Sequence, residues 1–167
     1  VLSVVQLVLA GAMALIALAV VGSVMWIRPS PRDQKLAKWR RDALMAGMKV
    51  RLQTLKAEPK NSGIRDDVEG VTYEWYNPEP AKQDKLTWAI VKADGWLQEG
   101  LPEGWSWYGQ EAEVDLQRVK DLIESLPVEV NAVERTPMSG RVIWGEQGTE
   151  FDAVKLKACL ETLQAIS

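Results

Sequence analysis

Residue types that carry most enzyme chemistry are scarce in this chain. The 167 residues include no histidine and a single cysteine, Cys159. The sequence therefore offers no Ser-His or Cys-His nucleophile pair, no imidazole metal site and no thiolate cluster. It also lacks the G-x-x-x-x-G-K-[ST] phosphate loop and the G-x-G-x-x-G dinucleotide fingerprint. Cys159 lies near Leu156, Leu160 and Leu163 in an expected helix, where a buried and unreactive thiol is favoured.

Three acidic residues, Asp66, Asp67 and Glu69, form a cluster whose oxygens suit a hard cation. Such cations need a dedicated loop, and the polar, turn-rich segment around these residues has no such architecture. A solvated turn is the favoured interpretation, so we expect no metal and no cofactor. Paired carboxylates for acid–base catalysis come together only in three dimensions, and the sequence leaves them open. On balance, we expect a protein that is not an enzyme.

The elements that would position any site begin with an uncharged stretch over residues 1–27. As a helix it would be roughly 40 Å long, more than the ~30 Å of a bilayer's hydrocarbon core. We therefore expect a retained transmembrane helix. A cleaved signal peptide is the alternative, but it would carry its positive charge before a short apolar region. Here the basic residues follow a longer apolar run.

Basic residues dominate the segment that follows. The predicted membrane-interface residues are Trp26, Arg28, Arg32, Lys35, Lys38, Arg40 and Arg41. Lys and Arg next to a spanning helix stay in the cytoplasm, and an indole ring prefers the headgroup level. We expect a bacterial inner-membrane protein with its N-terminus periplasmic and its C-terminal domain cytoplasmic. The basic face would contact anionic lipid headgroups, unless these charges only fix the topology.

Small residues on the apolar segment indicate a possible partner helix. Ala10, Ala14 and Ala17 share one face at i, i+4, i+7 spacing. Small side chains let helix backbones approach closely in lipid, although a generic alanine-rich anchor would look the same. The predicted partners are other integral membrane subunits.

The remaining pattern predicts an α+β fold. A cap at Ser30, Pro31 and Asp33 opens a basic juxtamembrane helix within 28–47 that ends at Gly47. Period-2 alternation predicts a strand at 48–55, and residues favoured in strands predict two more at 71–78 and 85–93. A helical stripe predicts a helix at 111–126. A hairpin of 128–134 with 141–145 comes next, and a capping box of Thr149 with Asp152 opens a last helix to Ile166. We expect a small cytoplasmic domain, 48–167, with a mainly antiparallel sheet and two or three helices.

Charge is unevenly distributed along the chain. Residues 28–60 hold ten basic and three acidic residues, whereas residues 61–167 hold ten basic and twenty acidic residues. An acidic domain is repelled by phosphate backbones, so nucleic acid is not an expected partner.

Aromatic residues gather in the Gly/Pro-containing segment 95–109. They are Trp96, Trp105, Trp107 and Tyr108. Either the segment folds over the core or it presents these rings to a partner, since Trp and Tyr are favoured at interface hot spots.

The N-terminal third resembles a known family. An apolar span, then Arg28-Pro29, a basic helix, a stop at Gly47 and a strand resemble the start of YajC, the small single-pass accessory protein of the bacterial preprotein translocase. The match covers roughly residues 10–52. The sequence departs from the family by lacking its Gln-rich basic run and its glycine-rich strand turn, and by adding about a hundred residues. The resemblance implies association with the translocase, and no functional residue carries over.

Three functions are therefore considered. The first is a non-catalytic, single-pass accessory subunit of a multisubunit inner-membrane complex, such as a respiratory or transport assembly. The second is a YajC-like translocase accessory protein. The third is a membrane-anchored enzyme or ligand-binding domain. A lone span, a small domain and no reactive constellation favour the first.

Overall fold

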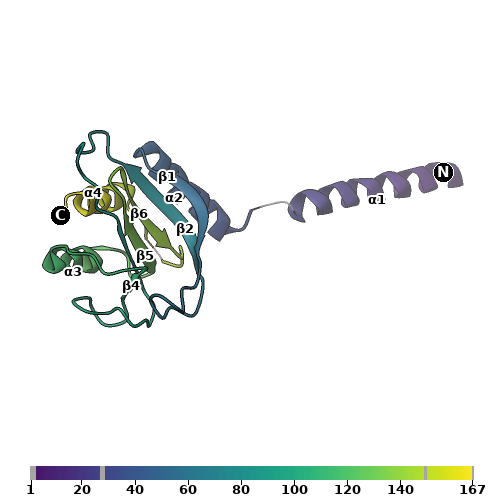
Figure 1. Ribbon diagram of the computed structural model, residues 1–167. Coiled ribbons are helices and arrows are strands. Elements are labelled where there is room, and N and C mark those ends of the chain that lie inside the picture. Colours follow the sequence, from purple (N-terminus) through teal and green to yellow (C-terminus); the bar gives the residue numbers. More distant parts are fainter. Residues whose placement is uncertain (1–2, 27–28, 149, 167) are drawn as a thin grey trace. The chain divides into compact units, whose positions relative to one another are not determined.

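A long apolar helix comes before the sheet domain. The computed structural model describes residues 3–26, 29–148 and 150–166, without the side chains of 24–26. Helix α1 (Val4–Trp26) is continuous (Figure 1). Its residues 4–23 have a mean hydropathy of 2.7, and none of them is buried. By length and composition α1 can cross a membrane, which is compatible with an anchor.

Helix α2 (Pro31–Met45) has the predicted ends. The Asp33 backbone N–H donates to Ser30 Oγ at 3.1 Å, and the Ser30 backbone N–H donates to Asp33 Oδ2 at 3.1 Å. This reciprocal pair is a capping box, and the Ser30 donors lower the pKa of Asp33. At the other end Gly47 has φ of 87°, and the Met48 N–H donates to the Ala43 carbonyl. Glycine reaches this left-handed conformation without steric cost, so it ends the helix.

All strand pairs in the sheet are antiparallel. The order is β1 (Lys49–Leu55), β2 (Val68–Tyr76), β6 (Ser139–Trp144), β5 (Val130–Arg135), β3 (Trp88–Val91) and β4 (Ser106–Tyr108). The predicted α+β class with a mainly antiparallel sheet is confirmed, as is the β5–β6 hairpin. Two details differ from the expectation. Strand β3 is shorter than the predicted strand 85–93, with the hairpin lying between β2 and β3 in the sheet. Strand β4 lies within the aromatic segment, for which no strand was predicted.

Two helices lie side by side over one face of the sheet, α3 (Leu116–Ser125) and α4 (Ala153–Gln164) (Figure 1). A β-carbon at Gly140 of β6 would lie 3.0 Å from Leu163, so the glycine lets α4 approach the sheet closely. The predicted inward residues Leu156, Leu160 and Leu163 are buried.

Both of these helices begin at an aspartate. Asp115 caps α3, which starts later than the predicted residue 111. Asp152 caps α4 by accepting from two backbone N–H groups, so it is the N-cap rather than the third helical residue. Its predicted capping partner, Thr149, lies outside the described residues.

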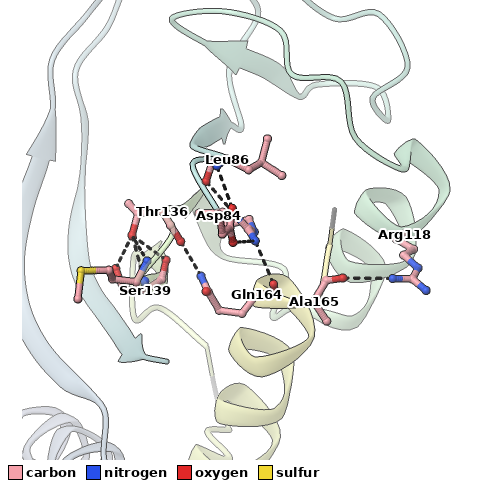
Figure 2. A network of polar contacts seen from close by, with 9 residues as sticks. Asp84, Leu86, Arg118, Thr136, Ser139, Gln164 and Ala165 are labelled. Atoms are coloured by element: carbon pink, nitrogen blue, oxygen red, sulfur yellow. Dashed lines mark hydrogen bonds and ion pairs between the residues drawn. The ribbon is translucent and has the colours of Figure 1, made fainter. Parts of the chain in front are cut away.

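A charged network fixes the far end of α4 (Figure 2). The Arg135 guanidinium is almost fully buried and donates to Asp84 Oδ2 at 2.6 Å, to the Leu86 carbonyl at 2.7 Å and to the Gln164 carbonyl at 3.2 Å. Arg118 donates to the Ala165 carbonyl at 3.2 Å. Cations at a helix C-terminus satisfy its free carbonyls, so the end of α4 is held to both α3 and β5.

Candidate functional site

The aromatic segment mostly folds over the core. Trp105 and Trp107 are buried, and the Trp107 ring meets Trp88 edge to face at 5.9 Å. The Tyr108 hydroxyl donates to the Lys56 carbonyl at 3.0 Å. Trp96 differs, because its side chain is 69% exposed and its ring lies against the backbone of Gly63. Of the four predicted partner residues, only Trp96 presents most of its surface to solvent.

A shallow hollow of about 840 Å³ lies beside Trp96 and includes the predicted acidic cluster in its lining. Asp67 is already engaged, since it accepts from Lys56 at 2.7 Å and from the Ala57 N–H at 2.8 Å. These donors lower the pKa of Asp67. Among the residues that the structure describes, no group of three or more His, Cys, Asp or Glu side chains is placed to hold a metal ion.

The predicted membrane-interface residues fall into two groups. Arg32, Lys35, Lys38 and Arg41 are exposed on α2. Arg40 is instead paired with Glu146 of the domain. Arg28 lies outside the described residues, as does the side chain of Trp26. The predicted packing residues Ala10, Ala14 and Ala17 are exposed along α1, so their face is accessible to a second helix.

The second half of α2 is part of the domain. The chain divides into compact units at Leu36 and Ala37, inside α2 and before the predicted domain start at residue 48. The cause is Trp39, whose ring stacks on Trp144 of β6 at 5.5 Å and on Phe151 at 5.7 Å. Tyr73 of β2 completes the aromatic cluster, 5.8 Å from Trp144 and 5.5 Å from Phe151. Offset aromatic pairs of this kind each add roughly 0.5–1.5 kcal/mol beyond their burial.

An ion pair beside the cluster holds the same helix. Glu146 is 4% exposed, and its carboxylate accepts from both Arg40 Nε, at 3.0 Å, and Arg40 Nη2. The Tyr73 hydroxyl donates to Glu146 Oε1 at 2.5 Å. Burial and this neighbouring carboxylate raise the pKa of Tyr73, while the same carboxylate raises the pKa of Arg40. Tyrosine and arginine therefore both remain protonated donors to one buried anion.

The backbone at Glu146 adapts to this contact. Its φ is 52°, a left-handed value that costs a residue with a β-carbon roughly 1–2 kcal/mol. The bidentate arginine pair and the tyrosine hydrogen bond offset that cost. We call the set of Trp39, Arg40, Tyr73, Trp144, Glu146 and Phe151 the α2 clamp.

An apolar groove of about 1270 Å³ opens next to the α2 clamp. It is formed by the end of α2, the end of α3 with the turn after it, and the start of α4. Apolar side chains make up much of its surface: Trp39, Leu126, Phe151, Leu156 and Cys159, with Met45 and Val154 among the most exposed large apolar side chains. Four carboxylates and one lysine also line it: Asp42, Glu124, Glu150, Asp152 and Lys155. We call this surface the acidic-rimmed groove.

Comparison of the chain with protein-family models, with curated proteins and with solved structures finds no match.

Sequence reasoning missed both the α2 clamp and the groove. The ring partners of Trp39 are Trp144 in β6 and Phe151 before α4, and both lie more than one hundred residues further along the chain. A signal for the groove did exist. Met45 and Val154 are apolar residues that lie outside the buried positions of α2 and α4, and both are exposed. Apolar residues off the core stripe are the sequence trace of a second apolar surface.

Proposed function

We propose that this chain is a non-catalytic, single-pass accessory subunit of a multisubunit bacterial inner-membrane complex. Helix α1 crosses the membrane with the N-terminus on the periplasmic side, and the sheet domain lies in the cytoplasm. The domain and the small-residue face of α1 both bind partner subunits.

The observation that carries the proposal is a spanning-length apolar helix joined to a domain with an acidic-rimmed groove. Exposed apolar side chains such as Met45 and Val154 give the groove a surface that a partner could cover. The α2 clamp supports the same role, because Trp39 and Arg40 fix the helix that follows the anchor to the sheet. Only residues 27–30 separate α1 from α2, so little chain lies between the anchor and the clamped helix.

A non-catalytic role is supported by the chemistry of the side chains. The sequence has no histidine, and Cys159 is buried, with its sulfur 3.5 Å from the Ser125 hydroxyl. A thiol in such a setting packs as a small apolar group.

Extraction in a mild detergent, native electrophoresis and mass spectrometry test the proposal. We expect the chain to migrate with a membrane complex in fixed stoichiometry. Migration with respiratory or transport subunits supports the proposal as stated, and migration with the translocase channel would replace it by the YajC-like role. Migration of the chain alone, after gentle crosslinking of intact cells, would refute it.

The anchor face has a matched pair of variants. Ala14→Leu places bulk on the face shared by Ala10 and Ala17, whereas Ala12→Leu makes the same change on the opposite side of α1. We expect Ala14→Leu to lower recovery of the partner and Ala12→Leu to leave it unchanged. Equal recovery with both variants would show that the small-residue face does not pack against a partner.

A further inference from the structure

We propose that the acidic-rimmed groove binds a positively charged amphipathic helix from a cytoplasmic segment of the partner subunit. The identity of the donor as a membrane subunit rests on the proposed function. The chemistry of the occupant rests on the groove itself.

Large apolar side chains are exposed along the groove. Met45 on α2 is 84% exposed and Val154 on α4 is 75% exposed, and both line the groove. The groove surface between these helices includes the edges of Trp39, Leu126 and Phe151. An amphipathic helix presents apolar side chains at i, i+3, i+4 and i+7, which is the pattern that fills such a groove.

The charge of the groove lining favours a basic occupant. Among the described residues of the lining, Asp42, Glu124, Glu150 and Asp152 are acidic and only Lys155 is basic. The Asp152 carboxylate caps α4, while Glu124 and Glu150 are exposed to solvent at the groove. Lys and Arg on the flanks of a bound helix would meet these carboxylates, and Glu or Asp there would be repelled.

The size and the charge of the groove disfavour other occupants. At about 1270 Å³ and open to solvent, the groove exceeds the roughly 300–1,000 Å³ typical of small-molecule sites. An anionic lipid surface would be repelled by its four carboxylates. A second copy of the domain would bring the excess of acidic residues in 61–167 toward the same acidic surface.

The test uses the full chain in nanodiscs of zwitterionic lipid, with empty nanodiscs as the blank. The probe is a fluorescent Leu/Lys amphipathic peptide of about 18 residues, long enough to be helical, and its Leu/Glu counterpart. We expect fluorescence anisotropy to show binding of the Leu/Lys peptide at least about tenfold tighter than that of the Leu/Glu peptide.

Matched substitutions locate the binding surface. Met45→Lys and Val154→Lys add a positive charge to exposed positions in the groove, so the fold should tolerate them. Leu52→Lys makes the same kind of change on β1, at a side chain that is 82% exposed and outside the groove. We expect each groove variant to weaken the Leu/Lys peptide about tenfold and Leu52→Lys to leave it unchanged. The inference would be overturned if the two peptides bound with equal affinity, or if all three variants changed the affinity for the Leu/Lys peptide equally. Sedimentation showing a dimer formed through this groove would also overturn it.

The same variants separate this inference from the proposed function. If the wild-type chain recovers no stoichiometric partner, the proposed function fails even where the peptide binds. If wild type and Met45→Lys recover the partner equally, the groove assignment fails while the accessory role stands.

Discussion

Replacing Arg40 and replacing Glu146, the two partners of a partly buried ion pair, should lower the stability of the domain by different amounts. Arg40→Ala leaves the Glu146 carboxylate in place with the Tyr73 hydroxyl as its remaining side-chain donor. Glu146→Gln removes the charge, and Arg40 can then turn toward water because its side chain is already 42% exposed. The arginine variant should therefore be the less stable of the two.

The expected magnitudes follow from the exposure of each partner. Glu146 is 4% exposed, and a buried charge without its partner costs roughly 3–5 kcal/mol. Water reaching the half-exposed arginine position lowers this to about 3 kcal/mol for Arg40→Ala. Glu146→Gln loses charge-assisted hydrogen bonds but buries no orphaned ion, so we expect about 1 kcal/mol. The double variant should be more stable than Arg40→Ala alone, because it no longer contains the buried anion.

Urea unfolding of the domain, followed by tryptophan fluorescence in a neutral detergent, measures these free energies. Arg51→Ala is a matched control, since Arg51 is 50% exposed and pairs with the buried Glu74 at 3.0 Å. In Arg51→Ala, Glu74 still accepts a hydrogen bond from the Ser139 hydroxyl at 2.9 Å and lies 4.0 Å from the Arg141 guanidinium. The variant should therefore lower the free energy of unfolding by about 1 kcal/mol or less. The role assigned to burial would be refuted if Glu146→Gln and Arg40→Ala lowered the free energy of unfolding equally. Strictly additive effects on this free energy in the double variant would refute it as well.

Three further predictions concern the core, the pH dependence and the topology. Trp107→Ala should destabilise the domain by about 3–5 kcal/mol, because the ring is 1% exposed, whereas Trp96→Ala should cost less than about 1 kcal/mol in the same unfolding assay. The hydrogen bond from Arg135 lowers the pKa of Asp84 below its usual value of 3.8, so the ion pair stabilises the fold fully above about pH 5 and less as the pH falls through the folded-state pKa. Asp84→Asn should therefore flatten the stability profile below about pH 5. A single cysteine introduced at Ser167, with the native thiol replaced, should resist an impermeant reagent in intact spheroplasts and react after lysis; labelling before lysis would reverse the proposed orientation.

Local signals in the sequence were sufficient for most of the elements and for the fold class. The capping box at Ser30 and Asp33 and the stop at Gly47 depend on contacts within one helical turn, and both ends of α2 are confirmed. The β5–β6 hairpin was predictable for the same reason, since its strands are adjacent in the chain. Such features are encoded by neighbouring residues.

The features that the sequence did not predict depend on contacts between residues far apart in the chain. Strand β4 is three residues long and carries no alternation, so only its pairing with β3 defines it. Glu146 gave no sign of a buried role, because its partners Arg40 and Tyr73 are 106 and 73 residues away. The groove likewise exists only where α2, α3 and α4 converge.

The strand order also bears on synthesis of the chain. Strands β1 and β2 can form a hairpin early, but the other edge of β2 pairs with β6, which is translated some sixty residues later. Until 139–144 emerge, that edge offers unpaired backbone groups to any neighbouring strand. The nascent protein thus passes through an aggregation-prone stage on the ribosome, and a chaperone or rapid completion of translation would protect it.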